Sequence, residues 1–459
     1  MTLRFLLAAL VAAAIPSTLA DTSTTYALLP STDVAAQRGP QIFNAVYDSL
    51  HKWGCVVHPN GMSLFLATVP EGVLLHHGNT RNATPTAPDW LAYEIEHAEM
   101  FARTRGPRGR RPPSEAQEPL ADTDMSSSEA EAQHGWLHTY RTIRPLSFLY
   151  LDGMSGDKDD SGVADTQDYL LRGVRNSQNK TRTLRSADDK VPGPPGEYDR
   201  ALDLCDLCAG WGLHGVIRTE GAGFEIIKCD FSDGLQEVQS MQRADNSGQP
   251  RRRRDPKGRY GDIGSSRTVL DYSSMVSAFF FPINLTNPDP KHFDLPRLTS
   301  TTPNEMNAIR HYLAQVVEAR DGIPISPFNH RDIADLVVHR YAAELSLMAN
   351  DTDSIENMAQ RIRFLLEVFI DYSVEEKVLR DTEARDRCST FYIQTMPRET
   401  EVDRLIYAAF KAVNTQICTT LFDIGQMVTN HLDADDALLP EIKDSLKSLK
   451  QYLSWDLFE

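Results

Sequence analysis

The sequence predicts an α+β N-terminal domain followed by an all-α helical domain, and three observations lead to this prediction. Before residue 243, short apolar runs separated by turn residues outnumber helical patterns, which favours an α+β fold over a doubly wound sheet. Residues 244–268 are rich in Gly, Pro, Asp and Arg and are typical of a linker. Beyond this linker, apolar residues recur at helical spacing, so residues 269–459 are predicted to form a helical bundle.

The elements of the N-terminal domain, residues 21–243, follow from local patterns. Apolar residues at helical spacing predict helices over 41–53, 95–102 and 202–209. Short apolar runs predict strands over 63–69, 73–77, 90–93, 137–141, 146–152, 215–218 and 224–230. We expect 137–141 to pair with 146–152, and the last two strands to form a hairpin.

The C-terminal domain opens with a strong helix signal. Thr302-Pro303-Asn304-Glu305 is a capping box with proline at the first helical position, and it predicts a helix to about residue 318. Further helices are predicted over 329–349, 354–372, 401–432 and 440–453. We expect residues 269–290 to be buried between the two domains.

Residues 1–20 have the pattern of a signal peptide, with a basic start, an apolar run too short to span a bilayer, and small residues at the end. The mature chain is then expected to begin near Asp21 and to be secreted. Four Asn-x-Ser/Thr triplets agree with export and glycosylation. The alternative is a cytosolic protein with an apolar N-terminal helix. No later segment has the length of a membrane span.

Six cysteines follow the predicted cleavage site, which permits up to three disulfides in an oxidising compartment. Chain position favours Cys388 with Cys418, and a second pair among the other four. Cys205 and Cys208 have redox or zinc spacing, but no second ligand pair completes a metal site, so a structural disulfide is preferred.

The formal net charge of −17 disfavours nucleic acid as a partner. Residues 103–134 combine a basic Pro-rich run with an acidic Ser-rich one and predict a long mobile insertion. Four consecutive arginines at 251–254 lie in the linker, where they are either solvated or a proteolytic processing site.

Three segments of the N-terminal domain carry candidate functional residues. An apolar run ends in His76-His77-Gly78, the segment beginning at Trp90 runs through Tyr93 into a helix containing Glu96-His97-Ala98, and Glu225 opens a late strand. In this order they resemble the His, aromatic and Glu motifs of the ADP-ribosyltransferase superfamily, in the branch of the poly-ADP-ribose polymerases and diphtheria-type toxins. The resemblance covers about residues 71–230 and implies a split antiparallel sheet.

The resemblance also implies site roles, with NAD as substrate and no metal. His77 is expected to bond a ribose hydroxyl of NAD, and Gly78 to expose its backbone to the nicotinamide amide. Trp90, or Tyr93 in another strand register, is expected to stack on the nicotinamide ring. Glu225 is expected to bond the nicotinamide ribose and to stabilise positive charge at the anomeric carbon as nicotinamide leaves.

The whole chain is also similar to a group of uncharacterised secreted proteins from filamentous fungi. They share the His-Gly segment, the Glu-His-Ala helix and the Asn-Leu-Thr-Asn-Pro-Asp-Pro stretch at 284–290. The sequence therefore predicts an ADP-ribosyltransferase or NAD glycohydrolase acting on an unknown protein or small-molecule acceptor. The alternative is a catalytically inactive secreted effector or binding protein that uses the same fold for protein interaction.

Overall fold

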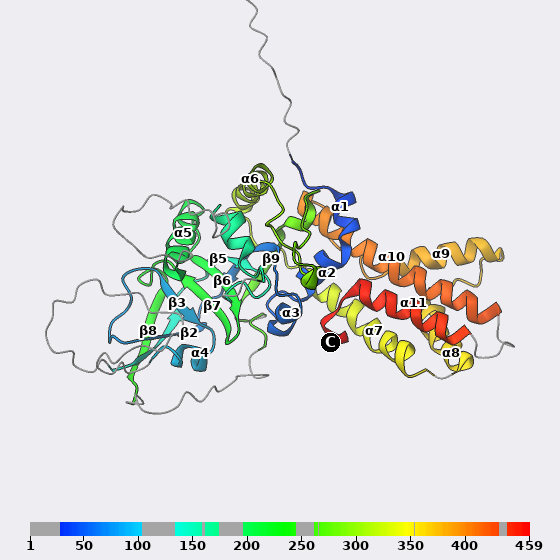
Figure 1. Ribbon diagram of the computed structural model, residues 1–459, viewed down its shortest axis with the longest axis horizontal. Coiled ribbons are helices and arrows are strands. Elements are labelled where there is room, and N and C mark those ends of the chain that lie inside the picture. The colour runs from blue at the N-terminus through cyan, green and yellow to red at the C-terminus, as the bar shows by residue number, and fades with distance from the viewer. Residues whose placement is uncertain are drawn as a thin grey trace, which may run out of the picture.

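The computed structural model describes residues 28–102, 134–157, 161–173, 196–244, 261–264, 266–352, 354–430 and 438–459. A body built on a β-sheet and a body of helices lie side by side in it (Figure 1). The predicted signal peptide at 1–20 and the arginines at 251–254 lie outside the described residues, as do nearly all of the 103–134 insertion and most of the 244–268 linker.

Nine strands form one sheet in the order β8-β4-β2-β3-β7-β6-β5-β1-β9. In chain order they are β1 (Ser63–Val69), β2 (Leu74–Asn79), β3 (Asp89–Ala92), β4 (Trp136–Thr142), β5 (Leu146–Leu151), β6 (Gly215–Glu220), β7 (Gly223–Lys228), β8 (Leu235–Gln242) and β9 (Val269–Ser277). The sheet is mixed, because β5 and β6 run parallel while the other neighbours run antiparallel.

Short helices cover parts of this sheet. They are α4 (Ile95–Glu99), a π-helical turn (Thr166–Leu171) and α5 (Glu197–Gly210). A disulfide between Cys205 of α5 and Cys229 after β7 ties the helix to the sheet. Helix α4 packs against β2 and β3, where Ala92, Ala98 and Leu137 form a small apolar cluster with Ala102.

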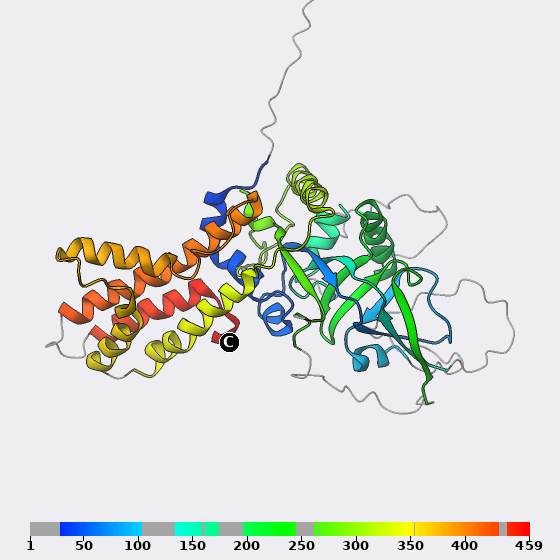
Figure 2. The same ribbon diagram turned by 180° about the vertical axis from the view of Figure 1, so that it is seen from behind.

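The helical body contains both ends of the described chain. Its helices are α7 (His330–Asn350), α8 (Ile355–Leu366), α9 (Lys377–Thr390), α10 (Glu401–Asn430) and α11 (Leu439–Leu453), together with α1 (Thr32–Gln37) and α2 (Gly39–Tyr47). Helix α6 (Pro303–Arg320) instead packs on β9 and the π-helical turn of the sheet-containing body. Helices α1 and α2 pack on α10, and α3 (Lys52–Val57) leads from them to the sheet (Figure 2). Phe43 of α2 contacts Phe410 of α10, with ring centroids 4.6 Å apart.

Most predicted elements are confirmed, with two differences in how they assemble. We predicted that 137–141 and 146–152 pair with each other, and this is wrong: β4 pairs with β2 and β8, whereas β5 pairs with β1 and β6. The sheet also extends past the predicted boundary at residue 268, because β9 pairs with β1 and 269–277 is therefore part of the sheet. The predicted hairpin is confirmed as β6 and β7.

The capping box at the start of α6 forms as predicted. The Thr302 hydroxyl accepts from the Glu305 backbone, and the Glu305 carboxylate accepts from the Thr302 backbone. The predicted disulfide between Cys388 and Cys418 joins α9 to α10. Cys205 pairs with Cys229 and not with Cys208, which is a buried free thiol like Cys55.

Candidate functional site

The three segments that carry the predicted site residues form adjacent strands. The sheet order places β2, β3 and β7 next to one another, although β4, β5 and β6 come between β3 and β7 in the chain. Their register aligns His76 of β2 with Ala92 of β3, and Ala92 with Glu225 of β7. Because side chains alternate along a strand, these three side chains share one face of the sheet, the face that α4 covers.

A pocket with a cavity volume of about 30 Å³ lies between this face and α4. Of the predicted site residues, it brings together His77, Gly78, Trp90 and Glu225, and it also includes residues that the sequence prediction gave no role, among them His76, His97 and Phe101. Tyr93 is not part of its lining: it is buried elsewhere, with its hydroxyl 2.7 Å from that of Thr268. Trp90 is therefore the aromatic residue of the second segment that faces the pocket.

Glu225 is held by a buried arginine. Arg218, its register partner on β6, is fully buried and donates to Glu225 Oε1 from Nε at 3.0 Å and from Nη2 at 2.5 Å. The same guanidinium also donates to Gln167 and to Glu197 of α5. Charge-assisted bonds in such a buried site fix the carboxylate in position.

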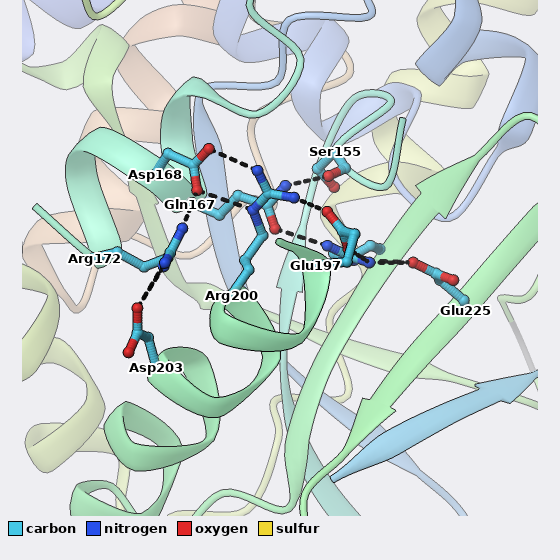
Figure 3. A network of polar contacts seen from close by, with 9 residues as sticks. Ser155, Gln167, Asp168, Arg172, Glu197, Arg200, Asp203 and Glu225 are labelled. Carbon is cyan, nitrogen blue, oxygen red and sulfur yellow. Dashed lines mark hydrogen bonds and ion pairs between the residues drawn. The ribbon is translucent and has the colours of Figure 1, made fainter. Parts of the chain in front are cut away.

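This arginine belongs to a larger polar network behind the pocket. Figure 3 shows Glu225 at one end of it, with Glu197, Arg200 and Asp168 farther along. Arg200 donates to both carboxylate oxygens of Asp168, and Arg172 donates to Asp168 and Asp203. Burial alone would raise the pKa of Asp168, but its bonds to Arg200 and Arg172 lower it overall. The network therefore stays charged and anchors α5 and the π-helical turn behind β7.

His77 bridges the two strands next to the pocket. Strands β2 and β3 share a single register pair, His76 with Ala92, and beyond it the His77 Nδ1–H donates to the Trp90 carbonyl at 2.8 Å. Its Nε2 accepts from the Asn79 amide at 3.1 Å. Burial lowers the pKa of His77 although the charge of Asp89 opposes this, so the ring is neutral at pH 7. Both ring nitrogens are thus engaged within the protein.

Gly78 is required by the packing of α4. A Cβ built at this position would lie 2.0 Å from the Ala98 carbonyl oxygen and 2.7 Å from the Ala102 backbone nitrogen. The helix backbone therefore sits directly on the strand, and no residue larger than glycine fits without moving α4. The sequence prediction gave Gly78 a ligand-binding role, whereas the structure shows a packing reason for the same residue.

His97 is the functional candidate that the sequence prediction missed. It lies on α4, is 1 % exposed and lines the pocket, with its Nε2 2.7 Å from Glu220 Oε1. Among the described residues, Nε1 of Trp90 and both ring nitrogens of His97 are buried pocket-lining polar atoms without a hydrogen bond of good geometry, although Nε2 of His97 has Glu220 as an ion-pair partner. Buried polar atoms are rarely left unsatisfied, so both residues mark places where a ligand or water would bind. The sequence could not reveal this, because nothing in the residues around His97 shows that its ring nitrogens lack hydrogen-bond partners in the folded protein.

Neither a metal centre nor a membrane segment is found in the described part of the chain. No group of three or more His, Cys, Asp or Glu side chains there could hold a metal ion. None of the helices within those residues is both long and apolar enough to cross a bilayer.

Comparison with known proteins identifies relatives of the sheet-containing part. The family model of the YPL277C N-terminal domain matches residues 31–135 and 111–250. Two proteins of Saccharomyces cerevisiae (strain ATCC 204508 / S288c) are similar to this chain. Uncharacterized protein YPL277C is 32 % identical over 222 residues, which is 46 % of this chain and 44 % of the relative. Uncharacterized protein YOR389W is 31 % identical over 223 residues, 46 % of this chain and 34 % of the relative.

The chain spans less than half the length of these two curated relatives. The matches support the predicted similarity to uncharacterised fungal proteins, and none of their names refers to an ADP-ribosyltransferase. No solved structure matches the chain.

Proposed function

We propose that the pocket binds the nicotinamide ribose of NAD and that the protein cleaves the bond between nicotinamide and ribose, passing ADP-ribose to an acceptor or to water. The adjacency of β2, β3 and β7 carries this proposal, because it gathers the His, aromatic and Glu segments around one pocket. The split antiparallel sheet that the resemblance implies is not found in the described residues: the nine strands form one mixed sheet, in which β2 and β3 share a single register pair.

The chain's own residues supply binding and charge in this proposal. The cavity volume of about 30 Å³ has room for about two waters, so α4 has to move away from the strands for the nicotinamide ribose to enter, and the adenosine end of NAD stays outside. Trp90 offers a flat aromatic face to the nicotinamide ring. Glu225, fixed by Arg218, stabilises the positive charge that develops at the anomeric carbon as nicotinamide leaves, an effect worth a few kcal/mol.

His77 has a positioning role in this proposal. Its side chain lies on the face of the sheet opposite to Glu225, in ring contact with His138 and Phe231, so it does not reach the ribose. The neutral ring holds β2 to β3 through its bond to the Trp90 carbonyl, next to the pocket. Gly78, packed under α4, contributes space and helix placement to the pocket.

Nicotinamide release from NAD tests this function. We expect the protein to release nicotinamide and E225Q to lose at least about 10²-fold in rate, since the variant keeps the shape of the side chain and removes its charge. The matched control is D271N, because Asp271 is also a buried strand carboxylate held by an arginine, Arg320, but lies outside the pocket. Absence of release with any acceptor, or equal rates for E225Q and D271N, would contradict the proposal.

A catalytically inactive binding protein is the second candidate. The observation that favours it is that Glu225 and His77 both make strong bonds within the protein, as in a structural site. Such a protein would bind NAD or a related ligand without releasing nicotinamide. Calorimetric titration with NAD beside the release assay distinguishes the two functions.

We also propose that the protein is exported. The signal-peptide pattern of residues 1–20 and the two disulfides support this, since disulfides persist in oxidising compartments. N-terminal sequencing of material from the culture medium of an expressing fungus should give a chain that starts near Asp21. Retention of the intact N-terminus inside the cell would contradict export.

A further inference from the structure

His97 is built into the structure as a base that faces the pocket. Its imidazole is 1 % exposed and is oriented by Glu220, whose Oε1 lies 2.7 Å from Nε2. Glu220 is the last residue of β6, and Glu225 is near the start of the adjoining β7. A carboxylate on one ring nitrogen fixes the ring orientation and leaves the other nitrogen for a ligand.

The other ring nitrogen has no partner among the described residues. Nδ1 is buried, and it lies 4.0 Å from the position that a Cβ of Gly223 would occupy. Gly223 thus leaves open the space between the imidazole and the start of β7, two residues before Glu225. A buried nitrogen without a partner, next to the Glu225 carboxylate, can accept a hydrogen bond from a water or a hydroxyl group in the pocket.

We propose that His97 Nδ1 accepts the proton of the water that attacks the anomeric carbon of NAD, so that water is an acceptor of ADP-ribose in this protein. The inference rests on the function proposed above. In this step the bond from the anomeric carbon to the nicotinamide nitrogen breaks, and nicotinamide leaves with the electron pair. The water oxygen bonds to the same carbon, and its proton moves to Nδ1 and later to solvent.

The charges around His97 determine the pH dependence of this step. Burial lowers the pKa of His97, but the bond to Glu220 and the charges of Glu220 and Glu225 outweigh burial and raise it overall, while Lys52 of α3 opposes them. His76 of β2 and Asp89 of β3 are further titratable residues in the lining of the pocket, and Glu96 precedes His97 on α4. The base acts only when neutral, so hydrolysis should rise with pH through a midpoint above the ordinary histidine pKa of about 6.5.

Hydrolysis of NAD by H97A, H97N and E220Q tests the inference. We expect H97A and H97N to lose on the order of 10²–10⁴-fold in kcat while NAD binding, followed by calorimetry, changes little. Added imidazole should restore part of the H97A rate. In E220Q the carboxylate that raises the pKa is gone, so the acidic limb of the pH profile should move to lower pH.

The control variant is H58N, because His58 is also paired with a carboxylate, Asp48 at 2.6 Å, and lies outside the pocket. An H97A rate that equals that of H58N, or an unshifted pH limb in E220Q, would overturn the inference. If H97A does not fold, the E220Q profile alone decides. A wild-type protein that releases nicotinamide in a Glu225-dependent way but does not need His97 refutes only this inference, whereas no release at all refutes the proposed function as well.

Discussion

Removing the Arg218 guanidinium should destabilise the sheet mainly through Glu225. Arg218 is fully buried and makes two of its bonds to the Glu225 carboxylate, which is itself 1 % exposed. In R218M the methionine preserves much of the side-chain volume and removes the charge. Glu197 keeps Arg200 as an ion-pair partner, so Glu225 is the carboxylate that loses its guanidinium.

The magnitude follows from the burial of the pair. Removing one member of a buried ion pair costs about 3–5 kcal/mol, because the remaining charge is left uncompensated in a poorly solvated site. We therefore expect R218M to lose about 3–5 kcal/mol of unfolding free energy at pH 7. The double variant R218M/E225Q should regain part of this loss, since an uncharged amide is less costly to bury than an unpaired carboxylate.

Urea unfolding of wild type, R218M, E225Q and the double variant measures this coupling as a double-mutant cycle. The expected interaction energy is at least about 1 kcal/mol, with the double variant more stable than R218M alone. Two outcomes would refute this prediction: losses of the two single variants that simply add, or an unfolding free energy of R218M within about 1 kcal/mol of wild type. Either would show that Arg218 does not stabilise the charged form of Glu225.

Three further predictions concern packing, buried charge and a disulfide. G78A should lose about 1–3 kcal/mol in thermal unfolding, because its Cβ would meet the Ala98 carbonyl oxygen at 2.0 Å; an unchanged Tm would show that α4 shifts freely. Burial raises the pKa of Asp152 to about 7, above its value of about 4 in the unfolded chain. The free energy of unfolding should therefore fall as the pH rises from about 4 to 7, because the unfolded chain ionises this carboxyl more easily. D152N should therefore be more stable than wild type at pH 8, by on the order of a few kcal/mol, and equal to it at pH 4 in urea titrations; the opposite trend would contradict this sign. C388S/C418S removes the disulfide between α9 and α10 and should lower the unfolding free energy by about 3 kcal/mol. Adding reductant should then cause no further loss through this disulfide. An equally stable variant would show that α9 and α10 need no cross-link.

The sequence predicted elements where one pattern dominates. The capping box at Thr302 and the apolar periodicity of α7, α8, α10 and α11 correspond to helices in the structure. Helix α9 was not predicted, because it is strongly polar and buries only Ala384, Cys388 and Ser389. Strand β8 was missed for a similar reason: it is an edge strand, and most of its side chains are exposed.

Strand pairing depends on tertiary topology and was harder to predict from the sequence. Strands β4 and β5 are neighbours in sequence and have the right pattern for a hairpin, yet four other strands separate them in the sheet order. Local periodicity reports that a strand exists and says nothing of its partner. The position of β9 at the sheet edge, far along the chain from β1, is a long-range contact of the same kind.

The candidate site was predicted in part. The motif order led to His77, Gly78, Trp90 and Glu225, and the structure places all four at one pocket. Tyr93 was an open alternative and lies away from it. The sequence could not indicate Arg218 or His97, because their roles come from contacts across strands and from an unpartnered ring nitrogen, which only the assembled sheet and α4 create.

A crystal structure of E225Q with NAD tests the central claim most directly, because this variant should bind NAD without turning it over. The account predicts the nicotinamide ring against Trp90, with the nicotinamide ribose next to residue 225 and under α4. An empty pocket at saturating NAD, or NAD bound at another place on the molecule, would contradict it.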